Sequence, residues 1–555
     1  MPSIIPTKLK PYFAMKKISY LIAALLLFVS SFTQAQLSSS NLPILLIDTQ
    51  GGVIRDEPKI TATLKLIYNG AGKRNALTDI PSGYNGKIGI EYRGSTSQMF
   101  PKKPYGFELQ DDSLKSIDAA LLGMPKESDW ILFASYNEKS LLHNAMAMKM
   151  ARDMGVYASR TQHVELVVNG KYEGVYVLME KVKRGSGRVN IGKMTDKDNA
   201  GDALTGGYIF KVDKTTGSTT GLGWNSKVPP PNALTKKTYY QYDYPKSENI
   251  TPAQRAYLPA VVDSAEAVLN GSNFLDKTNG YRKHFDAQSF AKLLLINEAS
   301  KNVDGYRIST FLHKDKNSKD RRIKAGPAWD YDLAFGNADY YNAIQYTGWS
   351  YLMNDPSDNW QVPFHWKRML EDTTFTRELR TEYQRLRRGA WKTATLHAYI
   401  DSLSTVLNEA QQRNFVRWPI LGQYVWPNPQ PIASSWSEEV RELKNWLQYR
   451  LEWMDVNLPG VITALEPTEK RVAGFSVTVS PNPFNSQAQL LILSPKRNEV
   501  LLEIIDMNGR AVGNRWVYLE EGSNQVTVPV DGMAGNYLLR LHTAQGAITK
   551  KLVKQ

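Results

Sequence analysis

The sequence predicts an α+β fold, with a central region made of a strand-rich lobe and a helical lobe and a small C-terminal β-sandwich. Short apolar runs of strand length dominate the first part of the central region, as at 42–66 and 105–110. Helical periodicity takes over after residue 250, and short alternating strands return after residue 474. This order predicts two lobes with a cleft between them, where we expect the functional site.

Turn and helix signals divide the strand-rich lobe into elements. Two apolar segments, 163–168 and 172–182, flank Asn169-Gly170, a residue pair favoured in two-residue hairpin turns. These segments therefore predict a β-hairpin. Apolar residues at helical spacing predict a helix over 138–154.

Periodicity also defines the second lobe and the C-terminal domain. The apolar spacing predicts helices over five segments, which are 251–269, 285–301, 375–388, 393–413 and 436–457. From Phe475 onward, six or seven short strands fit into about 80 residues. That density of strands is typical of a small β-sandwich.

Composition and charge narrow the function classes. The 555 residues include no cysteine, which excludes disulfides, thiolate nucleophiles and cysteine-ligated metals. The formal net charge of +14 is spread thinly, without a dense Lys/Arg run interleaved with aromatic residues. We therefore expect mostly solvated surface charge and no nucleic-acid partner. A nucleotide polyphosphate is the specific anionic ligand to consider next.

The N-terminal residues have the layout of a secretory signal peptide. A basic start at Met15-Lys16-Lys17 precedes an apolar run over 18–29 and a small, polar stretch over 30–36. The apolar run of about 12 residues is too short to span a bilayer, and no other segment reaches about 18 apolar residues. We therefore expect an exported protein whose mature part contains no transmembrane segment.

These patterns divide the chain into five predicted segments. They are an N-terminal extension with the signal peptide (1–36), a main two-lobed domain (41–370), a helical extension of its second lobe (371–460), a linker (461–474) and the β-sandwich (475–555).

Four motifs recur in order along the C-terminal segment. They are SPNPFN at 480–485, IDMNGR at 505–510, GNYLLR at 535–540 and KKLVK at 550–554. The segment resembles the type A sorting domain of type IX secretion, found in the Bacteroidetes phylum. The resemblance implies that the type IX secretion machinery exports the protein, which is then released or stays at the outer cell surface. The alternative is an unrelated adhesive sandwich.

Three segments of the central region carry a second resemblance. They are YRGSTS with PKKPYGF (92–97 and 101–107), VNGKYEGVYVLMEK (168–181), and NVDGYR with GPAWDYDLAFG (302–307 and 326–336). Together they resemble the CotH family, named for spore coat protein H, over roughly residues 41 to 370. The resemblance implies a protein-kinase-like domain with atypical sites for ATP and for Mg²⁺ or Mn²⁺.

Two aspartates of the third segment are expected to meet in space. The segments 308–313 and 322–325 predict a hairpin whose open ends place Asp304 and Asp330 close together. Phosphoryl transfer uses such a pair, because one carboxylate accepts the proton of the attacking hydroxyl and another holds Mg²⁺ against the phosphates. We therefore assign Asp304 as the base and Asp330 as a metal ligand. The alternative for the second aspartate is a capped turn.

The third segment contains further candidate metal ligands. Asp332 is a second candidate carboxylate, since both carboxylates can converge if they lie in a loop. A kinase catalytic loop carries a metal-binding Asn five residues after its Asp, and this chain has Ser309 there, a weaker and neutral ligand. Asn302 is the candidate substitute. The departure at Ser309 leaves open a protein that keeps the fold without turnover.

The resemblance also implies candidate nucleotide-binding residues. Lys103, in a basic stretch before a strand, is the candidate phosphate-binding lysine, with Lys102 as its competitor and Glu138 as the acid that pairs with it. Arg93 opens a loop whose backbone amides could cover phosphates, and Glu180 lies where a kinase hinge would hold adenine. The alternatives are a solvated lysine pair and an acid that serves the helix dipole.

Two function classes follow. The first is a secreted atypical kinase that transfers phosphate from ATP to Ser or Thr of exported or surface proteins. The second is a non-catalytic surface adhesion or structural protein with a CotH-like fold. A carbohydrate-binding module is a third interpretation, but it leaves the acidic pair unexplained. Binding of ATP with Mg²⁺ discriminates between the first two.

Overall fold

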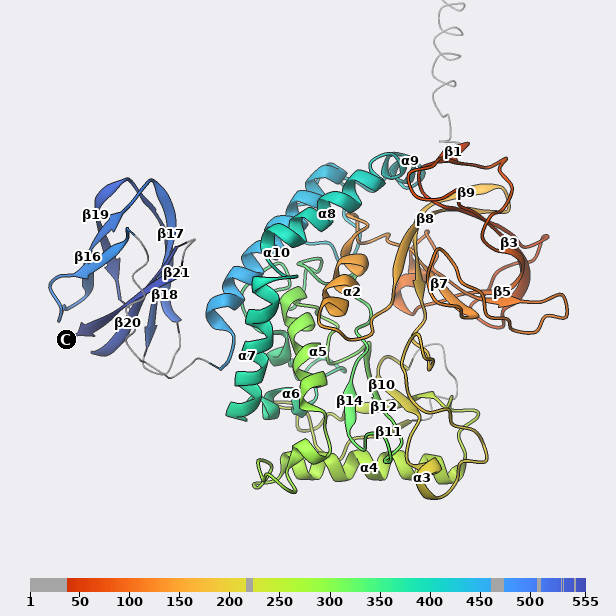
Figure 1. The fold of residues 1–555 in the computed structure, drawn as a ribbon, viewed down its shortest axis with the longest axis horizontal. Helices are drawn as coiled ribbons and strands as arrows, with labels where there is room; N and C mark the ends of the chain where they lie inside the picture. Colours follow the sequence, from red (N-terminus) through yellow and green to blue (C-terminus); the bar gives the residue numbers. More distant parts are fainter. Residues whose placement is uncertain are drawn as a thin grey trace, which may run out of the picture. The chain divides into compact units, whose positions relative to one another are not determined.

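In the computed structural model, seven strands of the described stretch 37–215 close into a barrel (Figure 1). Their order is β2-β3-β5-β6-β7-β9-β8, and the closing pair, β2 with β8, is parallel. The strands are β2 (Ile44–Asp48), β3 (Ile60–Ile67), β5 (Asn85–Tyr92), β6 (Tyr105–Gln110), β7 (Asp129–Phe133), β8 (Thr161–Val168) and β9 (Lys171–Glu180). Inward-facing side chains such as Leu64, Ile88 and Trp130 fill the interior.

The predicted hairpin around Asn169-Gly170 forms β8 and β9. Both turn residues have left-handed backbones, with φ of 51° and 76°, as this kind of tight turn requires. This hairpin was therefore predictable from local pattern, whereas β7 was not predicted. Closure of the barrel was not predictable, because it depends on parallel pairing of Ile44 with Glu165, far apart in the chain.

The helix predicted over 138–154 begins five residues later and forms α2 (His143–Asp153). The start is displaced because Leu141 has a left-handed backbone, with φ of 66°, which an α-helix does not contain. The carboxylate of Glu138 instead accepts hydrogen bonds from the hydroxyl of Ser140 and the backbone N–H of His143. It thereby satisfies a donor at the start of the helix.

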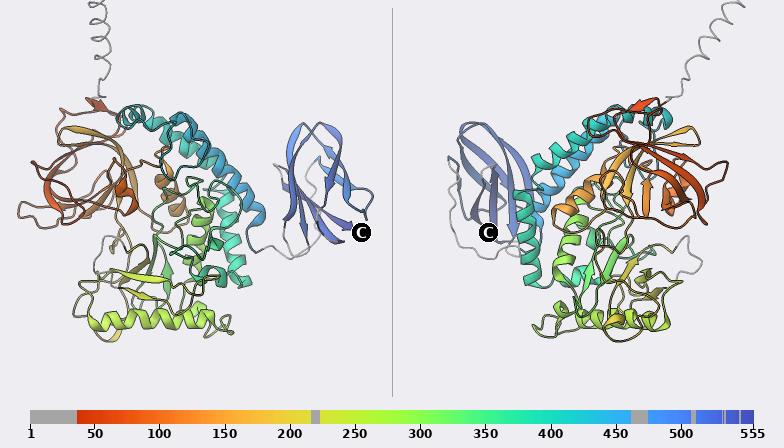
Figure 2. Two further views of the ribbon diagram at one scale, coloured as in Figure 1. Left: turned by 180° about the vertical axis from the view of Figure 1, so that it is seen from behind. Right: turned by 45° about the vertical axis from the view of Figure 1, so that its right-hand side comes forward.

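A second sheet, of five described strands in the order β11-β12-β10-β13-β14, follows the barrel. Its strands are β10 (Tyr208–Val212), β11 (Gly223–Asn225), β12 (Tyr239–Tyr244), β13 (Thr310–Lys314) and β14 (Ile323–Ala325), and α4 (Pro252–Asn270) runs along the sheet (Figures 1 and 2). The hairpin predicted between Asp304 and Asp330 is present, with Leu312 opposite Ala325.

The helices predicted after residue 250 are confirmed, with one break. Besides α4, they are α5 (Ala287–Ser300), α7 (Thr373–Arg388), α8 (Thr393–Leu407), α9 (Ala410–Arg417) and α10 (Trp436–Asn457). The short helices α3 (Gly201–Leu204) and α6 (Phe364–Met369) were not predicted. The predicted helix 393–413 divides into α8 and α9 at Asn408 and Glu409. Both residues form a turn that keeps right-handed helical dihedrals, so the chain direction changes little at the break.

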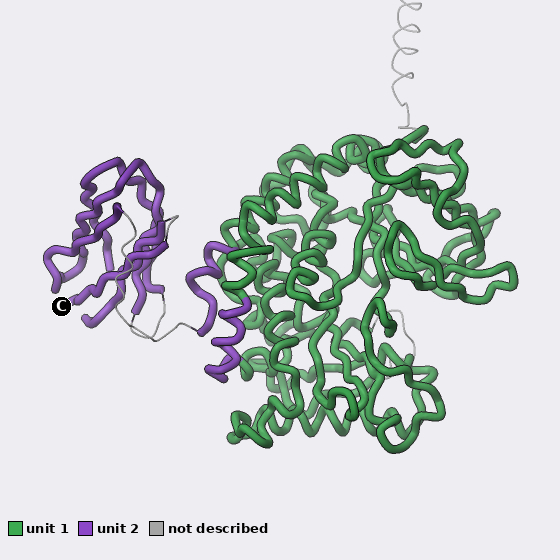
Figure 3. The backbone as a smooth tube through the Cα atoms, in the orientation of Figure 1, with its two compact units in different colours: residues 1–369, 383–450 green, residues 370–382, 451–555 purple. Residues whose placement is uncertain are grey.

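The chain divides into two units, coloured green and purple in Figure 3, which comprise residues 1–369 with 383–450 and residues 370–382 with 451–555. The structure describes residues 37–215, 223–460, 474–506, 511–530, 532, 534–543 and 546–555. The predicted signal peptide and residues 461–473 of the predicted linker lie outside these ranges. No helix of the described residues is long and apolar enough to cross a membrane.

The β-rich part of the second unit contains two sheets, β15-β16-β19 and β18-β17-β20-β21, among its described residues. Their strands are β15 (Ser476–Val479), β16 (Gln487–Ser494), β17 (Asn498–Asp506), β18 (Ala511–Leu519), β19 (Gly522–Pro529), β20 (Gly535–Thr543) and β21 (Gly546–Lys554). Leu490 of one sheet and Leu502 and Leu539 of the other belong to a single apolar core. The C-terminal residues therefore form the predicted sandwich.

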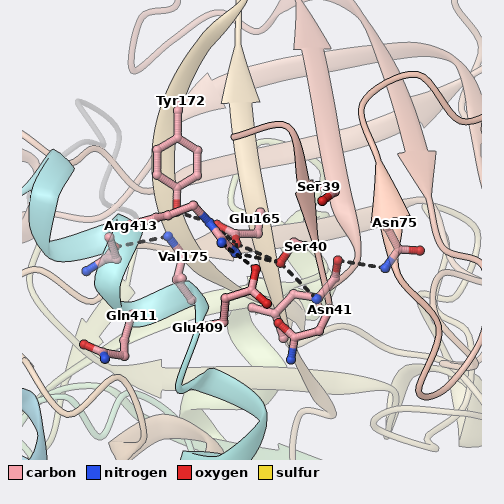
Figure 4. Close-up of polar contacts among 12 residues, drawn as sticks. Ser39, Ser40, Asn41, Asn75, Glu165, Tyr172, Val175, Glu409, Gln411 and Arg413 are labelled. Carbon is pink, nitrogen blue, oxygen red and sulfur yellow. Dashed lines mark hydrogen bonds and ion pairs between the residues drawn. The ribbon is translucent and has the colours of Figure 1, made fainter. Parts of the chain in front are cut away.

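A buried polar network ties the barrel to α9 (Figure 4). Glu165 of β8, which is fully buried, accepts hydrogen bonds from the hydroxyl groups of Ser40 (2.8 Å) and Tyr172. Its counter-ion is Arg413 of α9, whose Nε lies 3.1 Å from the carboxylate. The short strands β1 (Ser39–Ser40) and β4 (Asn75–Ala76) pair beside this network. One guanidinium therefore neutralises a buried carboxylate and fixes α9 against the barrel.

Replacing Arg413 by Met should destabilise the first unit by about 3–5 kcal/mol, because Glu165 would stay buried without its counter-ion. Urea denaturation followed by tryptophan fluorescence measures the loss. Arg74→Met is the matched control. Arg74 pairs with Glu409, but its side chain is 54% exposed, so its loss should cost less than about 1 kcal/mol. Equal losses in the two variants would contradict this account of the network.

Candidate active site

One cavity of about 420 Å³ in the first unit gathers charged side chains from separate segments. The loops that flank the β13–β14 hairpin supply Asp304, Asp330 and Asp332. The barrel, its adjoining loops and the second sheet supply four cationic side chains, Arg93, Lys181, Lys211 and Lys214, and four further acids, Asp56, Glu57, Glu91 and Asp213. This arrangement combines an acidic cluster with positive charge, as a site for a metal ion and an anionic substrate requires.

Asp304 lies in the loop between α5 and β13. Its Oδ1 lies 3.4 Å from Nη2 of Arg307, whose Nη1 in turn lies 2.5 Å from the carboxylate of Asp358. Burial raises the pKa of Asp304 above its ordinary value, although the charge of Arg307 opposes the shift. A buried carboxyl with a raised pKa, open to a cavity, is suited to accept a proton.

The carboxyl groups of Asp330 and Asp332 both line the cavity and interact with each other electrostatically. Burial raises the pKa of Asp330. Burial and the negative charge of Asp330 raise the pKa of Asp332 well above its usual range. The hydroxyl of Ser309 donates to Asp330 (3.1 Å), and the amide of Asn137 donates to Asp332 (3.3 Å).

Asn302 joins the two loops that carry these acids. Its Nδ2 donates to the backbone carbonyl of Asp330 (2.9 Å), and its Oδ1 accepts from the backbone N–H of Asp304 (3.2 Å). Ser309 and Asp330 have left-handed backbones, with φ of 51° and 64°. Such backbones cost roughly 1–3 kcal/mol each and persist only where the surroundings impose them. The side chain of Asn302 therefore hydrogen-bonds to both loops and holds them together.

The donor set at Asp330 and Asp332 fits one divalent cation bound together with phosphate. Mg²⁺ takes one or two carboxylates and fills its other positions with water and phosphate oxygens. Within the described residues, no group of three or more His, Asp and Glu side chains is arranged to hold a metal. Oxygens of substrate or water would therefore complete the shell. A bound cation would also relieve the repulsion that raises the pKa of Asp332.

The two candidate phosphate-binding lysines lie outside the lining of this cavity. Lys102 is buried and donates to the backbone carbonyl of Val175 (2.5 Å) and to Asn414 (3.0 Å), and burial lowers its pKa to about 7. Lys103 donates to the backbone carbonyl of Gln98 (2.5 Å). Protein acceptors therefore already engage both ammonium groups, and a phosphate-binding role for either residue stays a prediction.

The two candidate glutamates are also engaged elsewhere. Both carboxylate oxygens of Glu138 face the start of α2 rather than Lys103. Glu180 ends β9 and is fully buried, with Arg160 at 2.9 Å and Arg188 at 3.9 Å from its carboxylate. Neither residue lines the cavity.

Among the charged residues of the cavity that were missed from the sequence are Lys211, Asp213 and Lys214. They belong to and follow β10, where charged residues at the end of an apolar strand were the only local signal. Arg93, which was a candidate, does line the cavity, and its guanidinium lies 5.4 Å from the ring centre of Trp329. The fold therefore collects positive charge from segments that no single motif links.

Comparison with known families supports this picture of the central region. Residues 90–454, well over half of the chain, match the family described as CotH kinase protein. The chain belongs to the CotH family. The CotH match begins within β5 and runs through the helices beyond residue 370.

Residues 478–555 match the secretion system C-terminal sorting domain, which indicates handling by the type IX secretion machinery. No curated protein matches the chain.

Replacing Asp332 by Asn should raise the melting temperature of the metal-free CotH domain at pH 7. Because the folded-state pKa of Asp332 lies above its unfolded value, this carboxyl favours the fold while protonated and loses that contribution as pH rises through the raised pKa. The neutral amide removes this cost, and we expect a gain of roughly 2–4 °C. Differential scanning fluorimetry measures it, and the gain should shrink as the pH is lowered.

Asp112→Asn is the control for this measurement. Its side chain is fully exposed, so its substitution should leave the melting temperature unchanged at each pH. A fall in the melting temperature of Asp332→Asn at pH 7 would show that the carboxylate stabilises the metal-free fold, contrary to the strain inferred here.

Proposed function

We propose that this CotH protein is a secreted phosphotransferase that moves the γ-phosphate of ATP to a Ser or Thr hydroxyl of an exported or surface protein. The observation that carries the proposal is the convergence of Asp304, Asp330 and Asp332 with four cationic side chains in one cavity. The family match supports the class of chemistry, and the sorting domain supports an extracellular destination. In this proposal the barrel and the helix-covered sheet are the two lobes of a kinase-like domain.

Asp304 is the proton acceptor in this proposal. The acceptor oxygen forms a bond to the γ-phosphorus, and the bond from that phosphorus to the β,γ-bridging oxygen breaks. ADP leaves with the bonding electron pair, and the hydroxyl proton passes to the carboxylate of Asp304. The contact with Arg307 fixes the orientation of that carboxylate.

Asp330 and Asp332 are the proposed ligands of Mg²⁺ or Mn²⁺, which when bound supplies positive charge against the phosphates. Ser309 has a positioning role, because its hydroxyl holds Oδ2 of Asp330. In this proposal Ser309, which stands in place of the kinase Asn, therefore orients the stronger metal ligand Asp330. One metal ion, rather than two, is the stoichiometry that this donor set supports.

The cations of the cavity are the proposed partners of the phosphates. Lys211 is paired with Asp213 at 2.9 Å, and Lys214 donates to the hydroxyl of Thr96 (3.1 Å) in the loop after β5. The purine has an apolar surface available, since Met179 and Trp329 both line the cavity. A lining that combines charged and apolar side chains matches a nucleotide, which has charged phosphates and an apolar base face.

Asp304→Asn and Asp330→Asn should each lower phosphate transfer at least 100-fold, since each removes a group that acts on the reacting atoms. The test incubates residues 37–555 with γ-labelled ATP, Mn²⁺ and a generic protein acceptor. Asp401→Asn, an exposed carboxylate paired with Lys444, is the matched control and should keep the parent rate. Transfer that survives in either site variant would overturn that residue's role.

Lys214→Met should raise the KM for ATP about tenfold while leaving folding intact, because it removes one charge from the phosphate side of the cavity. Lys227→Met is the control, since Lys227 is mostly exposed and pairs with Asp263. Steady-state kinetics over a range of ATP concentrations separates KM from kcat. An unchanged KM in Lys214→Met would place the phosphates elsewhere.

A second candidate function is surface adhesion by a CotH fold without turnover. The observation that favours it is Ser309, which stands where a kinase catalytic loop has its metal-binding Asn. The two candidates differ in nucleotide binding. A parent chain that shows no Mg²⁺-dependent affinity for ATP would favour adhesion over phosphotransfer.

A further inference from the structure

A second cavity, of about 300 Å³, lies in the first unit and shares no lining residue with the candidate active site. Its walls come from the end of α2, the loop after β9, α5 and the β13–β14 hairpin. One wall is Gly326 to Ala328, the segment that leads into Asp330. Its volume is at the lower end of the range for small-molecule sites.

Arg188 lines this cavity with an unused hydrogen-bond donor. The residue is 4% exposed, and its guanidinium stacks 5.2 Å from the ring centre of Trp130. Its Nη1 donates to the backbone carbonyl of Lys181 (2.8 Å), but its buried Nη2 has no hydrogen-bond partner among the described residues. The buried hydroxyl of Tyr157, also in the lining, likewise has none within that part of the chain. Buried donors without partners are costly unless a ligand satisfies them.

The charge around Arg188 favours an anion. The buried carboxylate of Glu180 lies close to two guanidinium groups, those of Arg160 at 2.9 Å and Arg188 at 3.9 Å. One carboxylate cannot neutralise both, so one positive charge remains uncompensated by this cluster. Lys292 and Lys324 also line the cavity, but the ammonium of Lys324 already pairs with Asp320 at 3.1 Å.

The acidic residues of the cavity lining do not offset this excess of positive charge. Of the described lining residues, Asp286 alone is acidic, and its carboxylate lies 2.9 Å from the guanidinium of Arg322. The cavity therefore offers a positive end near Arg188 that a single negative charge would balance.

Part of the cavity lining is apolar. Met154, Leu293 and Ile296 line it together with Pro327. We propose that this cavity binds a small monocarboxylate with an apolar body, whose carboxylate accepts from Nη2 of Arg188 and the hydroxyl of Tyr157. A carboxylate with one negative charge suits two unpartnered donors and one excess positive charge better than a phosphate with two charges.

Hexanoate is the probe for this site, with hexanol and hexylamine as controls of the same chain length. Ligand-observed NMR titration of residues 37–555 should give hexanoate a Kd at least tenfold below those of hexanol and hexylamine. Arg188→Gln should weaken hexanoate at least tenfold. Equal affinity for hexanol, no saturable binding of hexanoate, or unchanged binding by a folded Arg188→Gln would each overturn the proposal.

A second variant keeps the test decisive if Arg188→Gln does not fold, since Arg188 also contacts Lys181 and Trp130. Val156→Phe adds volume in the cavity lining without touching the arginine cluster, and it should abolish hexanoate binding while the melting temperature stays near that of the parent. Lys227→Met, away from this cavity, should bind as the parent does. Full hexanoate binding by Val156→Phe would place the ligand elsewhere.

Discussion

A buried ion pair between Glu298 and Arg450 fixes the segment that carries Asp304. Both side chains are fully buried, and their charged groups lie 3.1 Å apart. Arg450 also donates to the backbone carbonyls of Tyr346 and Gly348 (2.8 and 2.7 Å), so one side chain of α10 holds the end of α5 and a long loop together. Burial raises the pKa of Glu298 and lowers the pKa of Arg450 to about 10, and each charge is therefore tolerable only beside the other.

The geometry of the candidate active site depends on this ion pair between Glu298 and Arg450. The chain leaves α5 through Lys301 and reaches β13 through Tyr306 and Ser309, and all three have left-handed backbones. Tyr306 is also tied to Glu298, by a hydrogen bond of 2.9 Å from its hydroxyl. Strained backbone of this kind requires support from its surroundings. The side chain of Asn302 links this loop to Asp330, and the two loops at the open end of the β13–β14 hairpin therefore line the same cavity.

The predictable part of this structure is the part that short-range pattern determines. Asp304 and Asp330 were paired from sequence because only a local hairpin separates them, and the turn at Asn169-Gly170 specified its own strands. Closure of the barrel was not predictable, because the sequence does not show that β2 pairs with β8. The cationic residues Lys211 and Lys214 of the cavity were not predicted, for the same reason. Lys102 and Lys103 had the basic local context, but Lys211 and Lys214 reach the cavity only through the fold of the second sheet.

The most direct test of the central claim is an anomalous diffraction measurement at the manganese edge. It requires crystals of residues 37–555 grown with Mn²⁺ and a non-hydrolysable ATP analogue. The account predicts one manganese peak bonded to Asp330 and Asp332, with the terminal phosphate of the analogue facing Asp304. A metal peak away from both carboxylates, or an analogue bound outside this cavity, would contradict the account.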